Sequence, residues 1–283
     1  MRVAVTGATG FIGLRVLREL AKIDDVEVIA VARRPSSALE GARKSIRQIA
    51  FDVSSASGSD TFERLGSPDI LIHLAWAGLP NYGSMHHFES HLSEQYQFLR
   101  SVIDGGLTSL TCTGTCFEYG MRSGELNESL TTDPQNPYGY AKDALRRQLE
   151  LLRRNRPFEL TWARLFYMYG QGQSAGSIYS QLIAAGIRGD KSFKMSKGEQ
   201  LRDFLPVEEV AKSIVSLALN ARDSGVVNVC SGHPVSIRSL VENWIEQHGF
   251  DLNLELGHFP YPNYEPMAFW GDATRLRQLL GSE

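Results

Sequence analysis

The chain has 283 residues, of which 42% are hydrophobic and 22% charged, and its formal net charge is −3 at pH 7. These values suit one large globular domain with a buried core, and they exclude strong nonspecific attraction to nucleic acid or to an anionic membrane. The three cysteines lack metal-ligand spacing, and no apolar stretch is long enough for a membrane span. The cysteine spacing therefore predicts no metal site. Because a strand pattern begins at residue 2, we expect no signal peptide, and we expect a cytoplasmic protein.

The first half of the chain alternates strand and helix patterns. Short β-branched apolar runs predict strands, and apolar residues at helical spacing predict helices between them. Strands separated by helices predict parallel βαβ units, and fully apolar strands predict a sheet that is covered on both faces. The predicted strands are Arg2–Thr6, Val26–Ala32, Ser45–Phe51, Ile70–Ala75, Thr108–Thr113 and Phe158–Leu165, and the main helices are Phe11–Lys22, His86–Asp104 and Tyr138–Asn155.

Beyond Gly170 the pattern is less regular. A polar loop at Gln171–Ser177 leads into further helices, among them Val207–Asn220 and Ile237–His248, and no second glycine-rich loop follows. We therefore expect an α/β protein whose residues 1–170 form a Rossmann-type doubly wound parallel sheet that binds a dinucleotide. Residues 171–283 would form a smaller C-terminal α/β substrate-binding lobe, interleaved with the sheet and not folding independently.

A glycine-rich segment joins the first predicted strand to the first predicted helix and reads VTGATGFIG from Val5 to Gly13. Gly7 permits a sharp turn, Gly10 lets the backbone approach a phosphate, and Gly13 lets the helix pack closely on the strand. The helix N-terminus offers free N–H groups and the positive end of its dipole to an anion. This spacing predicts a dinucleotide cradle; a strand–turn–helix crossing without a ligand is the alternative.

Candidate proton-transfer groups lie at the start of the predicted helix Tyr138–Asn155. Tyr138 and Lys142 are four residues apart and so share one helix face. The ordinary pKa of a tyrosine is about 10, and a neighbouring ammonium that lowers it would suit the hydroxyl to proton transfer. Thr115 follows the strand predicted at Thr108–Thr113, at the sheet edge where ligands bind. The alternative is that these are surface residues and a strand-favouring threonine.

Together with TGTCFEYG at 113–120, YGYAK at 138–142, RLFYMYG at 164–170 and GEQLRDF at 198–204, the glycine-rich segment resembles the extended short-chain dehydrogenase/reductase superfamily. Within it the chain is similar to the NAD(P)-dependent nucleotide-sugar epimerase/dehydratase/reductase family, over nearly its whole length. The resemblance implies a catalytic triad of Thr115, Tyr138 and Lys142. The cofactor contacts that it implies are Gly7, Thr9, Gly10, Phe11, Ile12, Gly13, Asp52, Val53, Leu74, Ala75, Tyr138, Lys142, Phe166 and Met168.

The resemblance also implies a substrate site. Arg202, in the RDF motif, occupies the position that clamps a substrate diphosphate in the family, a role that suits a bidentate guanidinium. A salt bridge with Glu199 or Asp203 is the alternative for this arginine. The other expected substrate contacts are Trp76, Cys116, Phe117 and Tyr167.

The chain departs from the family pattern at several of these positions. Cys116 and Phe117 stand where the sugar dehydratases carry an Asp-Glu pair, so elimination of water is not expected. Tyr167 replaces a common asparagine, no second diphosphate-binding arginine is evident near Tyr261–Pro266, and the helix that bears His91 lacks the common Asn-x-x-Gly. These departures leave the identity of the substrate more open than the redox chemistry.

The end of the second predicted strand indicates which cofactor is used. An acidic residue there binds the ribose hydroxyls of NAD, whereas arginine accommodates the 2′-phosphate of NADP. This chain has Arg33 and Arg34 and no acid, so we expect NADP, with NAD as second choice. Arginines that only solubilise the turn are the alternative.

The sequence as a whole predicts an NAD(P)H-dependent reductase of a nucleotide-linked 4-keto-6-deoxyhexose, serving deoxysugar supply for O-antigen or other polysaccharides. Hydride would go to C4, and Tyr138 would donate the proton. The alternatives are an NAD-dependent nucleotide-sugar 4-epimerase, a reductase of a non-nucleotide small carbonyl compound, and a non-catalytic NADP-binding protein. We expect a homodimer that pairs through the helices His86–Asp104 and Tyr138–Asn155.

Overall fold

The computed structural model describes residues 1–36, 46–55, 58, 60–261 and 265–281. A seven-stranded sheet in the order β11-β7-β5-β4-β1-β2-β3 forms its centre, and every neighbouring pair of strands is parallel. The chain enters at β1, winds outward through β2 to β3, and returns to the other side of β1 at β4. This is a doubly wound sheet, so the predicted fold class is confirmed. The strands are β1 Arg2–Thr6, β2 Glu27–Ala32, β3 Arg47–Ala50, β4 Ile70–His73, β5 Ser109–Thr115, β7 Glu159–Leu165 and β11 Gly225–Val229.

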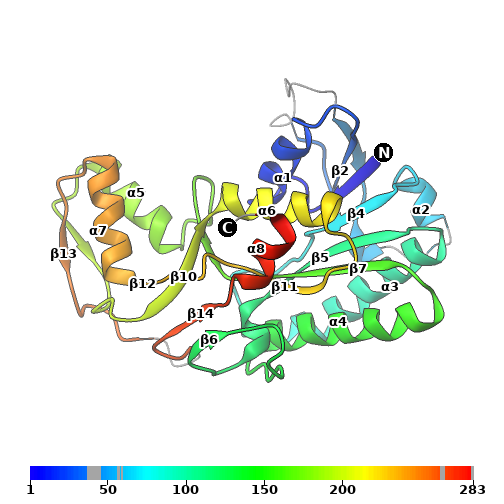
Figure 1. The fold of residues 1–283 in the computed structure, drawn as a ribbon. Coiled ribbons are helices and arrows are strands. Elements are labelled where there is room, and N and C mark those ends of the chain that lie inside the picture. The colour runs from blue at the N-terminus through cyan, green and yellow to red at the C-terminus, as the bar shows by residue number, and fades with distance from the viewer. Residues whose placement is uncertain (37–45, 56–57, 59, 262–264, 282–283) are drawn as a thin grey trace.

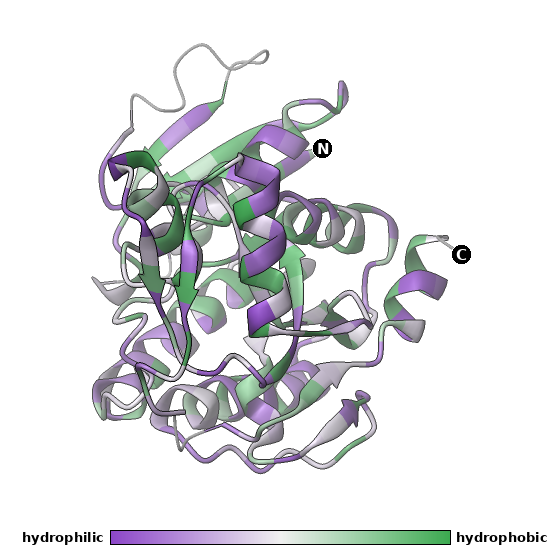
Figure 2. Ribbon diagram, turned by 90° about the vertical axis from the view of Figure 1, so that its left-hand side faces the viewer, coloured by the Kyte–Doolittle hydropathy of each residue, from purple (hydrophilic) through white to green (hydrophobic). Residues whose placement is uncertain are grey.

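Helices cover both faces of the sheet (Figure 1). Helices α1 (Gly13–Leu20), α6 (Val207–Asn220) and α8 (Thr274–Leu280) pack on one face, and α2 (Thr61–Arg64), α3 (Leu92–Asp104) and α4 (Pro137–Asn155) on the other. Alternate residues of β1 therefore enter different cores: Val3 and Val5 pack with α1 and α6, while Ala4 packs on the side of α3 and α4. Hydrophilic and hydrophobic residues alternate along the covering helices, as one-sided burial requires (Figure 2).

A second lobe is built from chain segments beyond β7 and lies beside the sheet (Figure 1). Its core brings together α5 and α7, with Leu182, Phe193 and Trp244 fully or almost fully buried between them and the small strands. Its elements are β8 Tyr167–Tyr169, α5 Ile178–Arg188, β9 Ser192–Lys194, β10 Leu201–Pro206, β12 Pro234–Ser236, α7 Ile237–His248 and β13 Asn253–Glu255. A separate pair, β6 (Gly124–Leu126) with β14 (Phe269–Gly271), lies below the sheet edge. Residues beyond 170 also return to the central sheet as β11, α6 and α8.

Several element boundaries differ from those predicted. Strand β5 continues to Thr115, because its pairing with β7 extends to Thr115 opposite Leu165. Strand β4 ends at His73, two residues early, because its pairing with β1 and β5 ends there, opposite Thr6 and Cys112. The helix predicted from His86 opens with a π-helical turn, η3 (His87–His91), before α3. The predicted start of the third strand, Ser45, lies outside the described residues.

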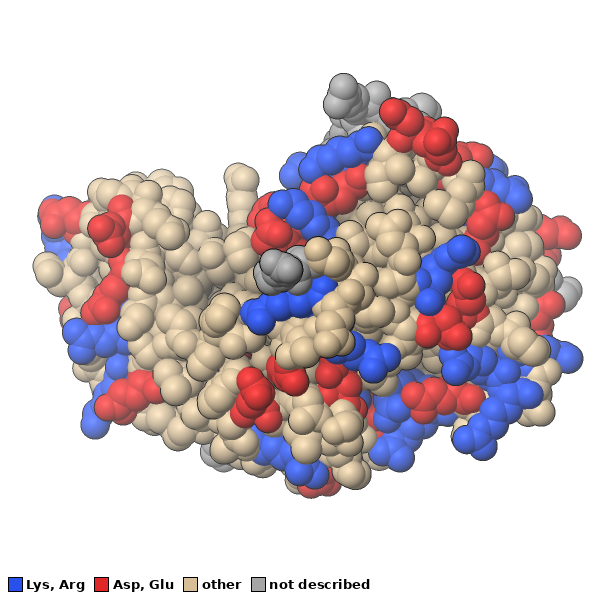
Figure 3. Space-filling model, viewed as in Figure 1, with Lys and Arg blue, Asp and Glu red and all other residues tan. Residues whose placement is uncertain are grey.

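Charged side chains of both signs are interspersed on the face shown in Figure 3. This mixture fits the small net charge and offers no broad single-sign surface on that face. Within the part of the chain that the structure describes, no helix combines the length and the apolar character needed to cross a membrane.

Candidate active site

The glycine-rich loop between β1 and α1 leaves no room for side chains. Gly7 has φ +68°, and a Cβ atom there would stand 2.9 Å from the backbone nitrogen of Ala75. A Cβ atom at Gly13 would stand 2.2 Å from the carbonyl oxygen of Gly7. Helix α1 has no side-chain cap at Ile12, so no side chain blocks its N-terminus, although the N–H groups of Leu14 and Arg15 already donate to the carbonyl oxygens of Gly10 and Ile12. The loop therefore fits the pyrophosphate of a dinucleotide.

Two neighbouring cavities meet at this loop. One, of about 370 Å³, extends to Tyr138, Lys142 and the second lobe; the other, of about 320 Å³, extends to the ends of β2 and β3. Gly7, Gly10, Leu74 and Trp76 line both. A phosphate-binding loop with a hollow on either side suits a dinucleotide, which carries one nucleoside on each side of its pyrophosphate.

The predicted cofactor residues divide between these cavities. The first is lined by Phe11, Ile12, Gly13, Tyr138, Lys142, Phe166 and Met168. The second is lined by Thr9, Arg33, Asp52, Val53 and Ala75. Arg34 lines neither cavity. Of the predicted substrate residues, Cys116, Phe117 and Tyr167 line the first cavity together with Thr115, and Trp76 lines both.

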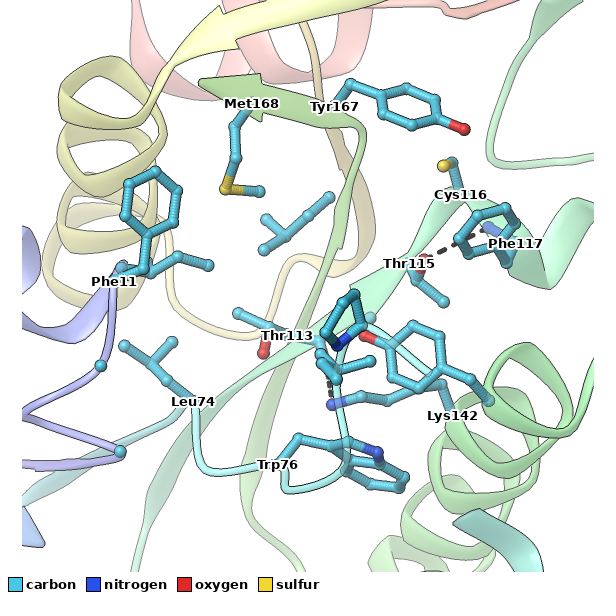
Figure 4. Close-up of a pocket in the computed structure, with 18 of the residues that line it drawn as sticks. Phe11, Leu74, Trp76, Thr113, Thr115, Cys116, Phe117, Lys142, Tyr167 and Met168 are labelled. Atoms are coloured by element: carbon cyan, nitrogen blue, oxygen red, sulfur yellow. Dashed lines mark hydrogen bonds between the residues drawn. The ribbon is translucent and has the colours of Figure 1, made fainter. Parts of the chain in front are cut away.

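The three predicted triad residues lie in the first cavity, although they come from β5 and α4. Figure 4 shows Thr115, Cys116 and Phe117 on one side of this cavity, opposite Phe11 and Leu74. The Lys142 ammonium donates a hydrogen bond to the carbonyl oxygen of Thr113, with Nζ and O 2.9 Å apart. Helix α4 begins at Pro137, and the Asn136 side chain caps it by accepting from the N–H of Gly139 at 2.8 Å. This cap fixes the helix turn that carries Tyr138.

Burial dominates the electrostatics of these groups. It raises the pKa of Tyr138 well above the ordinary value, and a hydrogen bond from the Thr115 side chain opposes this rise only in part. The expectation of a lowered Tyr138 pKa is therefore wrong for the protein alone, because burial outweighs the groups that lower it. Burial also lowers the pKa of Lys142 to about 8, so this side chain keeps its proton at neutral pH.

Thr115 is held in place by a carboxylate that the sequence analysis did not single out. Glu118, which is fully buried, accepts hydrogen bonds from the Thr115 backbone N–H at 2.9 Å and from Trp162 Nε1 at 3.0 Å. Its other oxygen accepts from Arg164 Nε at 2.7 Å. The Thr115 hydroxyl in turn accepts from the N–H of Phe117, which completes a capping box. The sequence signal was present, since Thr115 and Glu118 have capping-box spacing.

Arg202 is almost fully buried and lines neither cavity. Its Nη2 donates to Glu265 Oε2 at 2.9 Å, and the Tyr167 hydroxyl donates to Glu265 Oε1 at 2.5 Å. The ion pairs suggested by sequence, with Glu199 or Asp203, do not form; Asp203 instead accepts from Ser231. Glu265 lies 63 residues from Arg202, too far along the chain for local spacing to reveal the pair.

Comparisons with known proteins identify the family of the chain. Residues 3–230 match the model of the NAD dependent epimerase/dehydratase family. The chain is 31% identical over 278 residues to dTDP-6-deoxy-L-talose 4-dehydrogenase (NAD(+)) of Aggregatibacter actinomycetemcomitans, covering 96% of this chain and 99% of that protein. It is 28% identical over 298 residues to dTDP-6-deoxy-L-talose 4-dehydrogenase (NAD(P)(+)) of Kitasatospora kifunensis, covering 99% and 90%. A solved structure of MoeE5 in complex with UDP-glucuronic acid and NAD aligns with a TM-score of 0.81 and 27% identity, over 100% of this chain and 93% of that one.

The Glu118 network yields a stability prediction. Replacing Glu118 with alanine leaves the buried Arg164 guanidinium without its counter-charge, and we expect the free energy of unfolding to fall by about 3–5 kcal/mol. Urea unfolding of both proteins measures the difference. Glu242→Ala, which removes an exposed ion pair with Arg238, is the matched control and should change stability by less than about 1 kcal/mol. Equal losses in the two variants would contradict the importance of the buried pair.

Proposed function

The chain belongs to the NAD-dependent epimerase/dehydratase family, and on this premise we propose that it interconverts a hydroxyl and a ketone at C4 of a nucleotide-linked 6-deoxyhexose, working as an NAD(P)H-dependent 4-ketoreductase. The observation that carries the proposal is the first cavity. There Thr115, Tyr138 and Lys142 lie together, and the cavity ends at the glycine-rich loop. The substrate class rests on the two relatives named as dTDP-6-deoxy-L-talose 4-dehydrogenases.

The chain's own residues handle the proton. NAD(P), when bound, supplies or accepts the hydride at C4 of the sugar. Tyr138 donates a proton to the C4 oxygen during reduction, and the Thr115 hydroxyl binds the same oxygen as negative charge grows on it. Lys142 supplies a positive charge beside Tyr138 and a donor for cofactor hydroxyls. These roles need the three side chains in one cavity, where they lie.

The protonation state of Tyr138 suits the proton donor that reduction needs. Burial raises its pKa and so keeps the phenol protonated, the state that a proton donor needs. Oxidation at C4 uses the same groups in reverse, with Tyr138 accepting the proton. A reductase and a protein named as a 4-dehydrogenase can therefore share one site.

Dehydration is not part of the proposal. The two residues after Thr115 are a cysteine and a phenylalanine, so neither supplies a carboxyl group for elimination of water. Burial raises the pKa of Cys116, which keeps its thiol neutral, and Phe117 has no titratable group. With Tyr138 as the proposed proton donor and no second acid after Thr115, the site suits the reduction of one carbonyl group and not elimination of water.

For the cofactor, we infer NADP, with NAD as second choice. Arg33 is exposed and lines the second cavity beside Asp52, where a 2′-phosphate could reach its guanidinium.

We also propose that the protein is cytoplasmic, acts in deoxysugar supply for O-antigen or other polysaccharides, and forms a homodimer through α3 and α4. Tyr140 and Leu151, 53% and 55% exposed on α4, suit such a contact.

Replacing Tyr138 with phenylalanine removes the proton donor but keeps the ring. We expect kcat for NADPH-dependent reduction of a dTDP-4-keto-6-deoxyhexose to fall by about 10²–10⁴-fold, while the Kd for NADPH changes little. Absorbance at the NADPH band and calorimetric titration measure the two quantities. Wild-type turnover in this variant would refute the proton-donor role. Turnover of a nucleotide sugar without added reductant, by protein purified with bound cofactor, would favour a 4-epimerase instead.

Replacing Arg33 with aspartate should move cofactor preference from NADPH toward NADH. Loss of a charge-assisted hydrogen bond to the 2′-phosphate corresponds to a change of about 10–100-fold in the ratio of kcat/KM values. Arg34→Asp makes the same charge change one residue away, outside both cavities, and is the matched control. If the two variants shift the ratio equally, the phosphate contact at Arg33 is wrong.

For Arg202, we propose that its ion pair with Glu265 breaks when substrate binds and that the guanidinium then pairs with the substrate diphosphate. Arg202→Lys keeps the charge but loses the bidentate geometry, so KM for the nucleotide sugar should rise about tenfold or more, with less effect on kcat. Arg238→Lys, at an exposed arginine on α7, is the control. An unchanged KM in Arg202→Lys would favour a substrate without a diphosphate.

A further inference from the structure

The indole ring of Trp76 lies against the Lys142 ammonium, with Nζ 4.1 Å from the ring centroid (Figure 4). We propose that Trp76, oriented by His87, is a positioning residue that holds the Lys142 ammonium in the wall of the first cavity. This role rests on the proposed function, because Lys142 is there the group that serves Tyr138 and the cofactor. The proposal gives Trp76 the role of positioning Lys142, and it gives His87, which the sequence analysis did not single out, the role of orienting Trp76.

The surroundings of Lys142 explain why a ring face matters there. The side chain is 2% exposed, and within the described residues no carboxylate oxygen lies within 4.0 Å of its nitrogen. One hydrogen bond, to the Thr113 carbonyl, uses one of its three N–H donors. The negative face of an indole attracts a cation without consuming a donor, so the remaining N–H groups stay available to a ligand.

His87 determines how the indole is oriented. Trp76 Nε1 donates to His87 Nδ1 at 3.1 Å, which leaves the proton of the neutral ring on Nε2, 2.8 Å from the Asn81 carbonyl oxygen. Both nitrogens of this fully buried ring are therefore satisfied in one tautomer. Burial lowers the pKa of His87 and so favours the neutral ring that this pattern requires.

The hydrogen bonds of His87 connect Trp76 to the loop that contains Asn81, and the His87 ring also lies beside Tyr138. Asn81 belongs to a loop in which Leu79, Pro80 and Tyr82 line the first cavity. The His87 ring also lies 5.3 Å from the Tyr138 ring, centroid to centroid. Trp76 is only half-buried and lines both cavities, so its ring faces the groove as well as the core. Simple filling of the core would require a partner for the indole N–H, but it would not require a ring face against an ammonium.

A direct test replaces Trp76 with tryptophan that carries one, two or three ring fluorines, which weaken the negative face and leave the shape nearly unchanged. The pKa of Lys142, about 8 in the native protein, is read from ¹³C NMR titration of its Cε. Because a weaker face stabilises the ammonium less, the pKa should fall stepwise, by about half a unit to one unit in all. An identical Lys142 pKa across the series would overturn the proposal. The other titratable groups that face Lys142 are His73, His87, Cys112, Glu118 and Tyr138.

Two controls separate positioning from general stability. The same fluorinated residues at Trp244, buried in the second lobe, should leave the Lys142 pKa unchanged. His87→Phe removes the acceptor of the indole N–H, and we expect it to lower the Lys142 pKa in the same direction, whereas His87→Gln keeps an acceptor and should restore most of the native value. Equal Lys142 pKa values in native protein and a folded His87→Phe variant would refute the part assigned to His87.

The kinetic consequence has a defined sign. Reduction needs charged Lys142, so its rate falls as pH rises through the Lys142 pKa, and this decline should begin at lower pH as fluorines are added. A fully unchanged pH profile alongside a shifted NMR titration would show that the ammonium is not needed for turnover. The NMR titration requires no substrate. Failure to reduce any 4-keto sugar would therefore count against the proposed function, while an invariant titration would count against the role of Trp76.

Discussion

The buried carboxylate of Glu118 is the group that holds the wall of the first cavity formed by Thr115, Cys116 and Phe117. It lies where β5 ends and the short helix η4 (Cys116–Tyr119) begins, and it binds the Thr115 backbone and Trp162 and Arg164 on β7. A Cβ atom at Gly114 would stand 2.3 Å from its Oε1, so the strand can approach it only through a glycine. One charged group thus joins two strands and directs three consecutive residues, 115–117, toward the cavity.

Desolvation sets the chemistry of this cavity more than neighbouring charges do. It is the largest cause of the pKa shifts of Tyr138, Lys142 and Cys116, and it favours the neutral form of each group. For the phenol and the thiol this means a bound proton; for the amine it means a charge that is easily lost. A site of this kind stabilises an ammonium only where something compensates for lost water, and the Trp76 ring lies where that compensation is required.

The sequence predicted the features that local spacing determines and missed those set by distant contacts. Short motifs predicted the glycine-rich loop and the helix that carries Tyr138 and Lys142. Strand patterns that alternate with helix patterns predicted the doubly wound sheet. The sequence analysis ended this strand at Thr113, before Gly114, because glycine often ends a strand. In the structure β5 continues to Thr115, since Gly114 and Thr115 still pair with β7. The partner of Arg202 and the pKa direction of Tyr138 depend on burial and on chain segments dozens of residues away, which spacing does not encode.

The absence of acids after Thr115 and the burial of Tyr138 act together. A carboxylate in place of Cys116 or Phe117 would add a negative charge close to a phenol whose ionised form burial already disfavours, and it would open a second route for protons. A neutral thiol and a phenyl ring leave the Tyr138 hydroxyl as the proton donor that we propose beside Thr115. In the proposed reduction, the charge that grows on the carbonyl oxygen would meet the hydroxyls of Tyr138 and Thr115 in the cavity that Lys142 also lines. This set of groups is why we propose a single proton transfer coupled to a single hydride transfer.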